Sequence, residues 1–223
     1  MTELRLALFD FDGTLTDSLA TIQRITKDAC KIAGAPIPDD AEIRANIGQG
    51  LLVSAISYAQ GDAALGQIIF DEYRRQHRRE LANPDGERDK LFDGAEDCVR
   101  ALAADGWLLG IVTNKGRHGL DTLLDGYGMI DLFDVRMTAD DTVVKPAPDM
   151  ALAALARTGA EAQHTYLIGD TLNDAHCAKG AGVQFIGVGW GYHDVGELTA
   201  AGAIHIAQDF DDLYHVLSTS QPD

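Results

Sequence analysis

The sequence has few cysteines, and their placement argues against a disulfide framework. It contains three cysteines in 223 residues, and Cys30, Cys98 and Cys177 lie far apart, with no pair in a CxxC arrangement. A disulfide-rich domain or a zinc site would carry an even or closely spaced set. We therefore expect three buried free thiols, because a free cysteine packs as a small apolar residue.

Positive charge is also scarce. The chain has 18 Lys and Arg residues against 35 Asp and Glu residues, which gives a formal net charge of −17. This charge repels nucleic acid and anionic membranes, so neither is an expected partner. An anionic substrate would need a local cation, either a bound metal ion or specific Lys and Arg side chains.

Long apolar runs are missing as well. No segment has the apolar length needed to cross a bilayer, and the first residues lack the apolar centre of a signal peptide. We therefore expect a cytoplasmic protein that is a monomer or a small homo-oligomer.

The chain does have the composition of a globular protein and two distinct periodic patterns. Hydrophobic residues make up 46% of it, which is enough for a sizeable core. An apolar run at 4–9 predicts a buried strand, and strands alternate with helices from residue 91 onward, which predicts a doubly wound α/β sheet covered on both faces. Residues 16–90 show only helical periodicity, with no strand signal. We predict an α/β core of residues 1–15 and 91–223 and an inserted, all-helical cap of residues 16–90.

Polar side chains gather where the predicted strands, or the loops that follow them, end. Open parallel sheets bind ligands at the carboxyl ends of their strands, so groups that are distant in sequence can meet there. Four such clusters occur: Asp10 with Asp12, Thr113 with Asn114, Lys145, and Asp170 with Asp174.

The chemistry of these clusters is that of a phosphate site with a metal ion. The four aspartates offer hard oxygen ligands of the kind that Mg²⁺ prefers, and no His and Cys grouping indicates zinc. Neutral donors come from Thr113, Asn114 and the backbone amides around Gly13 and Lys115, and one positive charge comes from Lys145. A carboxylate placed against phosphorus can attack in line, and a second carboxyl group can protonate the leaving oxygen.

The four clusters resemble the four motifs of the haloacid dehalogenase superfamily, in the same order and over essentially the whole chain. The matching stretches are DFDGT at 10–14, Thr113-Asn114, Lys145-Pro146 and GDTLND at 169–174. Within that superfamily, IGQGL at 47–51 and GWGY at 189–192 resemble phosphoglycolate-phosphatase-like members. The resemblance implies that residues 16–90 form a helical cap over the site.

The resemblance also implies roles for the two aspartates of the first motif. Asp10 would be the nucleophile that forms an aspartyl-phosphate and would contact the metal ion. Asp12 would be the general acid and then the general base, with its backbone carbonyl on the metal ion.

The other motif residues would hold the phosphate and the metal ion. Phosphoryl oxygens would be bound by Gly13, Thr113 and Asn114, while Lys145 would neutralise developing charge and steady the nucleophile. Asp170 and Asp174 would complete a Mg²⁺ site, the latter directly or through metal-bound water.

From these observations we expect a Mg²⁺-dependent phosphatase that acts on a small phosphorylated metabolite, with 2-phosphoglycolate as the first candidate. Alternatives within the superfamily are a phosphosugar mutase, a pyrophosphatase and a dehalogenase. A dehalogenase is disfavoured because it would leave Asp12, Asp170 and Asp174 idle. The alternative from another class is a receiver-type signalling switch that keeps a phosphorylated aspartate. Those modules carry no helical insertion.

One basic cluster remains outside this assignment. Arg74, Arg75, His77, Arg78 and Arg79 follow one another closely within a predicted helix. Such charge runs usually form a solvated helix face, and we expect that arrangement here, although the cluster could lend positive charge to an otherwise acidic molecule.

Overall fold

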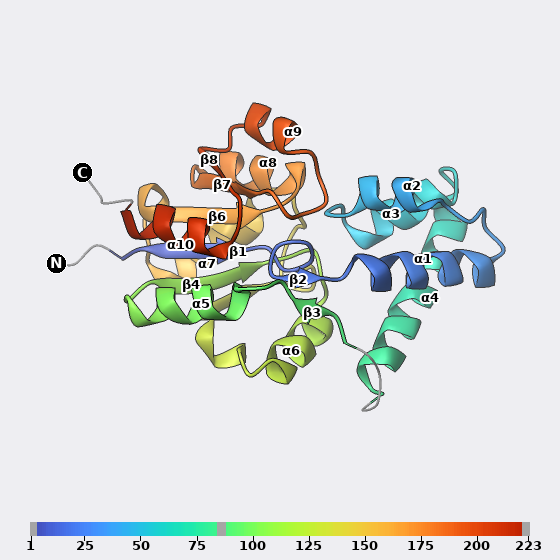
Figure 1. Ribbon diagram of the computed structural model, residues 1–223. Coiled ribbons are helices and arrows are strands. Elements are labelled where there is room, and N and C mark those ends of the chain that lie inside the picture. The colour runs from blue at the N-terminus through green and yellow to red at the C-terminus, as the bar shows by residue number, and fades with distance from the viewer. Residues whose placement is uncertain (1–3, 84–87, 220–223) are drawn as a thin grey trace.

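The protein folds around a six-stranded parallel sheet with helices on both faces, as the computed structural model of residues 4–83 and 88–219 shows (Figure 1). All neighbouring strands of this sheet run parallel, with Leu6 of the first strand paired to Leu108 on one side and Thr165 on the other. The fold class expected from the sequence is confirmed. In spatial order the strands are β5 (Val135–Met137), β4 (Leu108–Val112), β1 (Leu6–Phe9), β6 (Thr165–Gly169), β7 (Gln184–Val188) and β8 (His205–Ala207).

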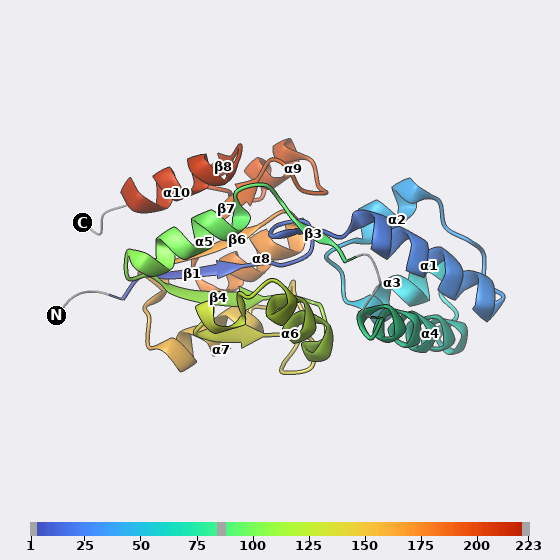
Figure 2. The same ribbon diagram turned by 60° about the horizontal axis from the view of Figure 1, so that its bottom comes forward.

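Each strand contributes alternate side chains to two separate apolar layers. In β1, Ala7 and Phe9 enter the layer beneath one set of helices, whereas Leu6 and Leu8 enter the opposite layer. Figure 2 shows this sheet between its helices. The first set is α5 (Ala95–Ala104), α6 (Arg117–Gly126) and α10 (Phe210–Thr219), and the second is α7 (Asp149–Thr158), α8 (Leu172–Ala181) and α9 (Val195–Ala200). Single 3₁₀ turns occur at Ile130–Leu132 and Ala162–His164.

The strand order places β1 at the point where the chain switches direction across the sheet. The next two strands of this sheet in sequence, β4 and β5, lie on one side of β1, and β6 to β8 lie on the other. Ligand sites of open α/β sheets form at such a switch point, outside the carboxyl ends of the strands. Asp10 follows the last residue of β1, and its backbone N–H donates to the Ile168 carbonyl on β6 (2.9 Å).

A helical unit is inserted between β1 and the rest of the sheet, and it has an apolar core of its own. Its four described helices are α1 (Leu19–Ala33), α2 (Asp40–Asn46), α3 (Leu51–Tyr58) and α4 (Ala63–Leu81). Ile43 and Ile69 are among the buried side chains of this core. Asp39 and Asp62 cap the starts of α2 and α4 by accepting hydrogen bonds from backbone N–H groups, as helix N-caps do.

The chain enters and leaves the helical unit through a short antiparallel ribbon. Strand β2 (Thr16–Asp17) pairs with β3 (Lys90–Leu91). The expectation of helices alone over 16–90 is wrong at these ends, because a two-residue pairing depends on the meeting of two distant chain crossings and leaves no periodic signal. Residues 83–90 (NPDGERDK) are rich in turn-forming residues, and part of the polar loop that this composition predicts lies outside the described residues.

Two further expectations concern burial and membranes. Cys30, Cys98 and Cys177 are buried free thiols, as expected. Among the described helices, none combines the length and the apolar character that a bilayer crossing needs.

Candidate active site

The structure brings three of the four predicted acidic residues into one buried cluster. Asp10, Asp170 and Asp174 each offer a carboxylate oxygen, and these atoms lie within 4.8 Å of one another. They come from the ends of β1 and β6 and from the start of α8. The convergence that the sequence predicts for the carboxyl edge of the sheet is therefore present for these residues.

Lys145 supplies the positive charge of this cluster. Its ammonium Nζ lies 2.8 Å from Asp10 Oδ1 and 2.6 Å from Asp174 Oδ1, and its side chain is 1% exposed. Burial alone would lower the pKa of Lys145, but the two carboxylates outweigh burial and raise it. The ammonium is within ion-pair distance of Asp10 Oδ1 but off the hydrogen-bond direction, and no other donor among the described residues is aligned on that oxygen.

Hydrogen bonds hold the other two carboxylates in place. Asp170 accepts one from the Thr14 hydroxyl (3.0 Å) and one from the Tyr192 backbone N–H (2.9 Å). Asp174 Oδ2 accepts from both the hydroxyl and the backbone N–H of Thr171, at 2.6 and 3.0 Å. These two hydrogen bonds form the capping box at the start of α8, where Thr171 is the N-cap residue. The helix N-terminus itself therefore orients Asp174.

The electrostatics of the cluster fit a divalent cation. Burial raises the pKa of Asp10 to about 7 despite the opposing effect of Lys145, and burial together with the neighbouring carboxylates raises that of Asp170 well above its usual range. Three buried carboxylates beside one lysine carry surplus negative charge, and all the donor atoms are hard oxygens. The residues present thus suit Mg²⁺ in both charge and ligand chemistry.

Asp12 lies apart from this cluster because its side chain pairs with Lys115. Lys115 Nζ donates to Asp12 Oδ1 and Oδ2, at 2.9 and 3.0 Å. Burial tends to raise the pKa of Asp12, but the charge and hydrogen bonds of Lys115 outweigh it and lower the pKa. The carboxylate of Asp12 is therefore kept ionised, and the sequence interpretation missed Lys115 as its partner.

The Asn114 side chain forms hydrogen bonds to other parts of the protein. Its amide nitrogen donates to the Gly48 carbonyl (2.9 Å) and the Lys145 carbonyl (3.0 Å), and its oxygen accepts from the Lys145 backbone N–H (2.9 Å). Both amide hydrogens are thus engaged, so the phosphate contact predicted for Asn114 would have to come from its backbone. The Thr113 hydroxyl accepts from the Lys115 N–H (3.2 Å) and keeps its own hydrogen for a ligand.

Gly13 serves the site through its lack of a side chain. Its φ of 86° lies in the left-handed region, and a Cβ there would come within 2.4 Å of Asp170 Oδ2. Its backbone N–H donates to the Thr16 carbonyl (2.8 Å) inside the turn. The phosphate contact predicted for the Gly13 amide is therefore replaced, in this conformation, by a bond within the turn.

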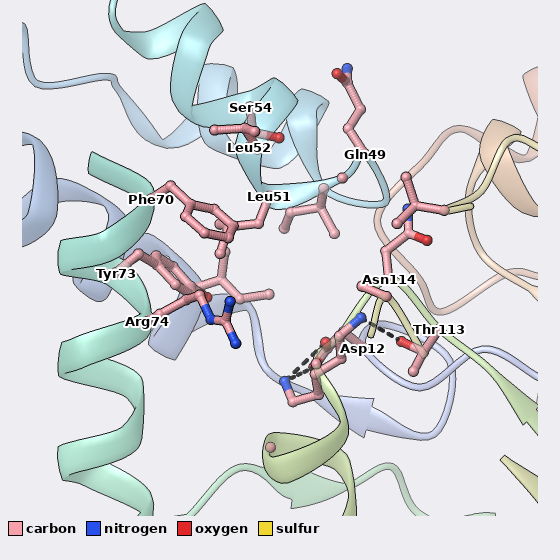
Figure 3. Close-up of a pocket in the computed structure, with 18 of the residues that line it drawn as sticks. Asp12, Gln49, Leu51, Leu52, Ser54, Phe70, Tyr73, Arg74, Thr113 and Asn114 are labelled. Atoms are coloured by element: carbon pink, nitrogen blue, oxygen red, sulfur yellow. Dashed lines mark hydrogen bonds and ion pairs between the residues drawn. The ribbon is translucent and has the colours of Figure 1, made fainter. Parts of the chain in front are cut away.

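A cavity of about 550 Å³ lies between the sheet edge and the helical unit. Figure 3 shows Asp12, Thr113 and Asn114 on the core side and Leu51, Phe70 and Tyr73 opposite them, on α3 and α4. The loop at Gly48–Gly50 closes one side. Phosphate bound at Asp10 would therefore face the core, and the rest of a substrate would face the helical unit.

Hydrogen bonds connect the helical unit to the loop that follows β7. The Arg44 guanidinium of α2 donates to the carbonyls of Tyr192 (2.9 Å) and Gly191 (3.1 Å), and His193 Nε2 lies 3.3 Å from the Ile47 carbonyl. The Tyr192 hydroxyl accepts from the Ser18 backbone N–H (3.0 Å). GWGY at 189–192 thus connects core and helical unit, which the sequence alone did not indicate.

Comparison with known proteins shows similarity over the stretch of chain that contains the four motifs. The family described as "Haloacid dehalogenase-like hydrolase" matches residues 7–188. Among curated relatives, "Probable phosphatase IndB" of Dickeya dadantii (strain 3937) is 33% identical over 220 residues, which cover 93% of this chain and 91% of the relative. A "Phosphoglycolate phosphatase" of Yersinia pseudotuberculosis is 31% identical over 199 residues, covering 85% and 83%.

Solved structures share the whole architecture. A hydrolase from Pseudomonas syringae superimposes with a TM-score of 0.83 at 25% identity, and the alignment covers 98% of this chain and 100% of that one. A phosphatase from Clostridium acetobutylicum, described as predicted, reaches a TM-score of 0.86 at 24% identity and covers 97% and 99%. The helical unit is therefore part of the fold shared with these proteins.

Proposed function

Because this chain belongs to the haloacid dehalogenase-like hydrolase family and is a phosphatase, we propose that it hydrolyses a small phosphomonoester through an aspartyl-phosphate on Asp10. The observation that carries the proposal is the position of Asp10 at the floor of the cavity, within the buried cluster of Lys145, Asp170 and Asp174. A small phosphorylated compound is the class of substrate that this arrangement suits.

In the first step, a carboxylate oxygen of Asp10 bonds to phosphorus while the bond from phosphorus to the leaving oxygen breaks. For this step Asp12 must be in its protonated form, although Lys115 favours the ionised form, and it transfers that proton to the leaving oxygen. Lys145, 2.8 Å from Asp10, orients the nucleophile and offsets charge on the phosphoryl oxygens. Thr113 is placed to donate its hydroxyl hydrogen to one of these oxygens.

In the second step, Asp12 takes a proton from water as the water oxygen attacks phosphorus, and the bond to Asp10 breaks to release phosphate. The ion pair with Lys115 favours the ionised form of Asp12, which is the form that this step needs.

A Mg²⁺ ion would be held by Asp10, Asp170 and Asp174, with the Asp12 backbone carbonyl as a further ligand. Bound there, it would neutralise charge that the carboxylates and phosphoryl oxygens bring together. We further propose that residues 16–90 act as a cap that admits substrate on opening and excludes bulk water on closing, as lids do in such reactions.

The first substrate to test is 2-phosphoglycolate, because several curated relatives are named for its hydrolysis. A panel of small phosphate esters should be assayed with Mg²⁺ and with a chelator. Steady release of phosphate that the chelator abolishes is the expected result. A stable phosphoprotein without turnover would instead indicate a receiver-type switch, and transfer of the phosphoryl group back to a sugar would indicate a mutase.

A further inference from the structure

The basic cluster on α4 divides into residues that line the cavity and residues that do not. Arg75 pairs with Glu72 on the same helix and does not line the cavity. Arg74, His77 and Arg78, by contrast, line the cavity, because spacings of three and four residues place side chains on one helix face. Arg74 and Arg78 are exposed, as expected for a solvated face, but these two and the half-buried His77 also border the cavity.

Arg74 is held in the cavity by an aromatic ring and has only a weak carboxylate partner. Its guanidinium carbon lies 5.4 Å from the centre of the Phe70 ring, within cation–π range. Its Nη2 lies 3.9 Å from Asp140 Oδ1, and the two side chains are 45% and 46% exposed, so this ion pair contributes little. Figure 3 shows the Arg74 side chain extending from α4 into the cavity, toward the side where Asp12 lies.

The two lysines around the cavity already have close carboxylate partners, whereas Arg78 is engaged, among the described residues, only through one hydrogen bond. Lys145 pairs with Asp10 and Asp174, and Lys115 pairs with both oxygens of Asp12. Arg78 donates its Nε hydrogen to the Arg74 carbonyl. Arg74 therefore has a charged head that a second anion in the cavity could reach without breaking a strong contact.

We propose that Arg74 binds a second acidic group, a carboxylate or a further phosphate, on the part of the substrate that leaves with the phosphoester oxygen. This assignment rests on the proposed function, in which the phosphate to be cleaved lies against Asp10. With a net charge of −17, the protein repels substrates that carry additional negative charge unless a local cation offsets the repulsion. The cavity of about 550 Å³ leaves room for such a group beyond the phosphate.

The chain offers a matched pair of variants for the test. Arg74→Gln removes the charge inside the cavity, and Arg75→Gln removes a charge of the same helix that pairs with Glu72 and does not line the cavity. Both are compared with the unaltered protein on two pairs of substrates. The first pair is 2-phosphoglycolate and ethyl phosphate, which lacks the carboxylate; the second is propane-1,3-diol bisphosphate and propyl phosphate, which lacks the second phosphate.

For Arg74→Gln we expect kcat/KM to fall about tenfold on whichever acidic substrate is used, which corresponds to about 1.4 kcal/mol of binding. The fall should come from a higher KM, because the contact is made in the ground state and the transition state alike. The two esters without a second acidic group should change by less than about twofold, and Arg75→Gln should behave as the unaltered protein on all four substrates. Arg74→Lys should recover part of the loss, because it restores the positive charge without the planar guanidinium.

Equal losses on the esters with and without a second acidic group would overturn the assignment, because Arg74 would then act on the cleaved phosphate or on the fold. Unchanged kcat/KM on both acidic substrates would also overturn it. The carboxylate and bisphosphate arms distinguish which acidic group is bound. If the unaltered protein cleaved none of the four esters while remaining folded, the proposed function itself would fail, and this assignment with it.

Discussion

Replacing Asp10 by Asn should abolish turnover and yet stabilise the metal-free protein. The carboxylate is buried beside two others, and burial raises its pKa from 3.8 to about 7 even though Lys145 opposes the rise. Since each pKa unit is worth about 1.4 kcal/mol, the ionised form costs the folded state on the order of 4 kcal/mol above pH 7. Asn removes this charge and keeps the size of the side chain, so part of that free energy should be recovered.

The direction in which the free energy of unfolding changes with pH follows from the protonation of Asp10 in the folded and unfolded states. The unfolded chain loses the Asp10 proton near its ordinary pKa of 3.8, whereas the folded protein keeps it until about pH 7. Between about pH 4 and 7 the folded state therefore binds more protons, and the free energy of unfolding falls as pH rises. In the Asp10→Asn variant this contribution is missing, so its stability should exceed that of the unaltered protein at pH 8 and approach it at pH 5.

Urea unfolding in the presence of a chelator, at pH 5 and pH 8, measures this difference. An exposed aspartate, replaced as Asp125→Asn, serves as the matched control and should leave the pH dependence unchanged. Adding Mg²⁺ should stabilise the unaltered protein at pH 8, because the cation offsets the surplus carboxylate charge. The difference in stability between the variant and the unaltered protein should then become smaller. An Asp10→Asn variant that unfolds at lower urea concentration than the unaltered protein at pH 8 would refute the reasoning.

Three further predictions concern the acid group and the closed cavity. Asp12→Ala should lower kcat on alkyl phosphates far more than on an activated aryl phosphate, whose leaving oxygen needs no proton; equal losses in a steady-state assay would argue against the acid role. Arg44→Ala removes two charge-assisted hydrogen bonds to core carbonyls, each worth about 1.5–3 kcal/mol. Limited proteolysis should therefore cut the helical unit faster, and an unchanged rate would show that these bonds do not hold the helical unit to the core. Gly48→Ala should lower kcat/KM without unfolding the core, because its Cβ would meet Thr171 Cγ2 at 2.7 Å at a φ of 88°, and full activity would show that the loop can close another way.

Periodicity and motif order predicted the main features of the fold and the members of the carboxylate cluster. Apolar runs that end in aspartate mark strand ends of a parallel sheet, so the sequence alone places Asp10 and Asp170 at one edge of that sheet. The ribbon at Thr16–Asp17 and the six-residue helix α9 at Val195–Ala200 were missed, because elements this short carry no periodic pattern.

The contacts of the site residues could not be predicted in the same way. Lys115 follows two predicted site residues directly, yet its partner Asp12 lies 103 positions away, and only the fold sets that distance. The place of Arg74 could not be predicted either, because a run of charged residues in a helix does not indicate which face of the helix borders a cavity. The one signal in the sequence for Arg74 was its helical spacing with His77 and Arg78, which share its face.

Asn114 shows how closing of the helical unit can be coupled to the chemistry. Its amide bonds the Gly48 carbonyl of the loop before α3 and, at the same time, the carbonyl and N–H of Lys145, whose ammonium lies beside Asp10. Opening of the helical unit would break the bond to Gly48 and leave those to Lys145 intact. The loop that carries Lys145 would then remain bonded to Asn114, which follows β4, but would no longer be connected through it to the helical unit. Asn114 thus joins the two parts of the protein through its side chain, next to the loop whose ammonium is paired with Asp10, and its backbone remains for the predicted phosphate contact.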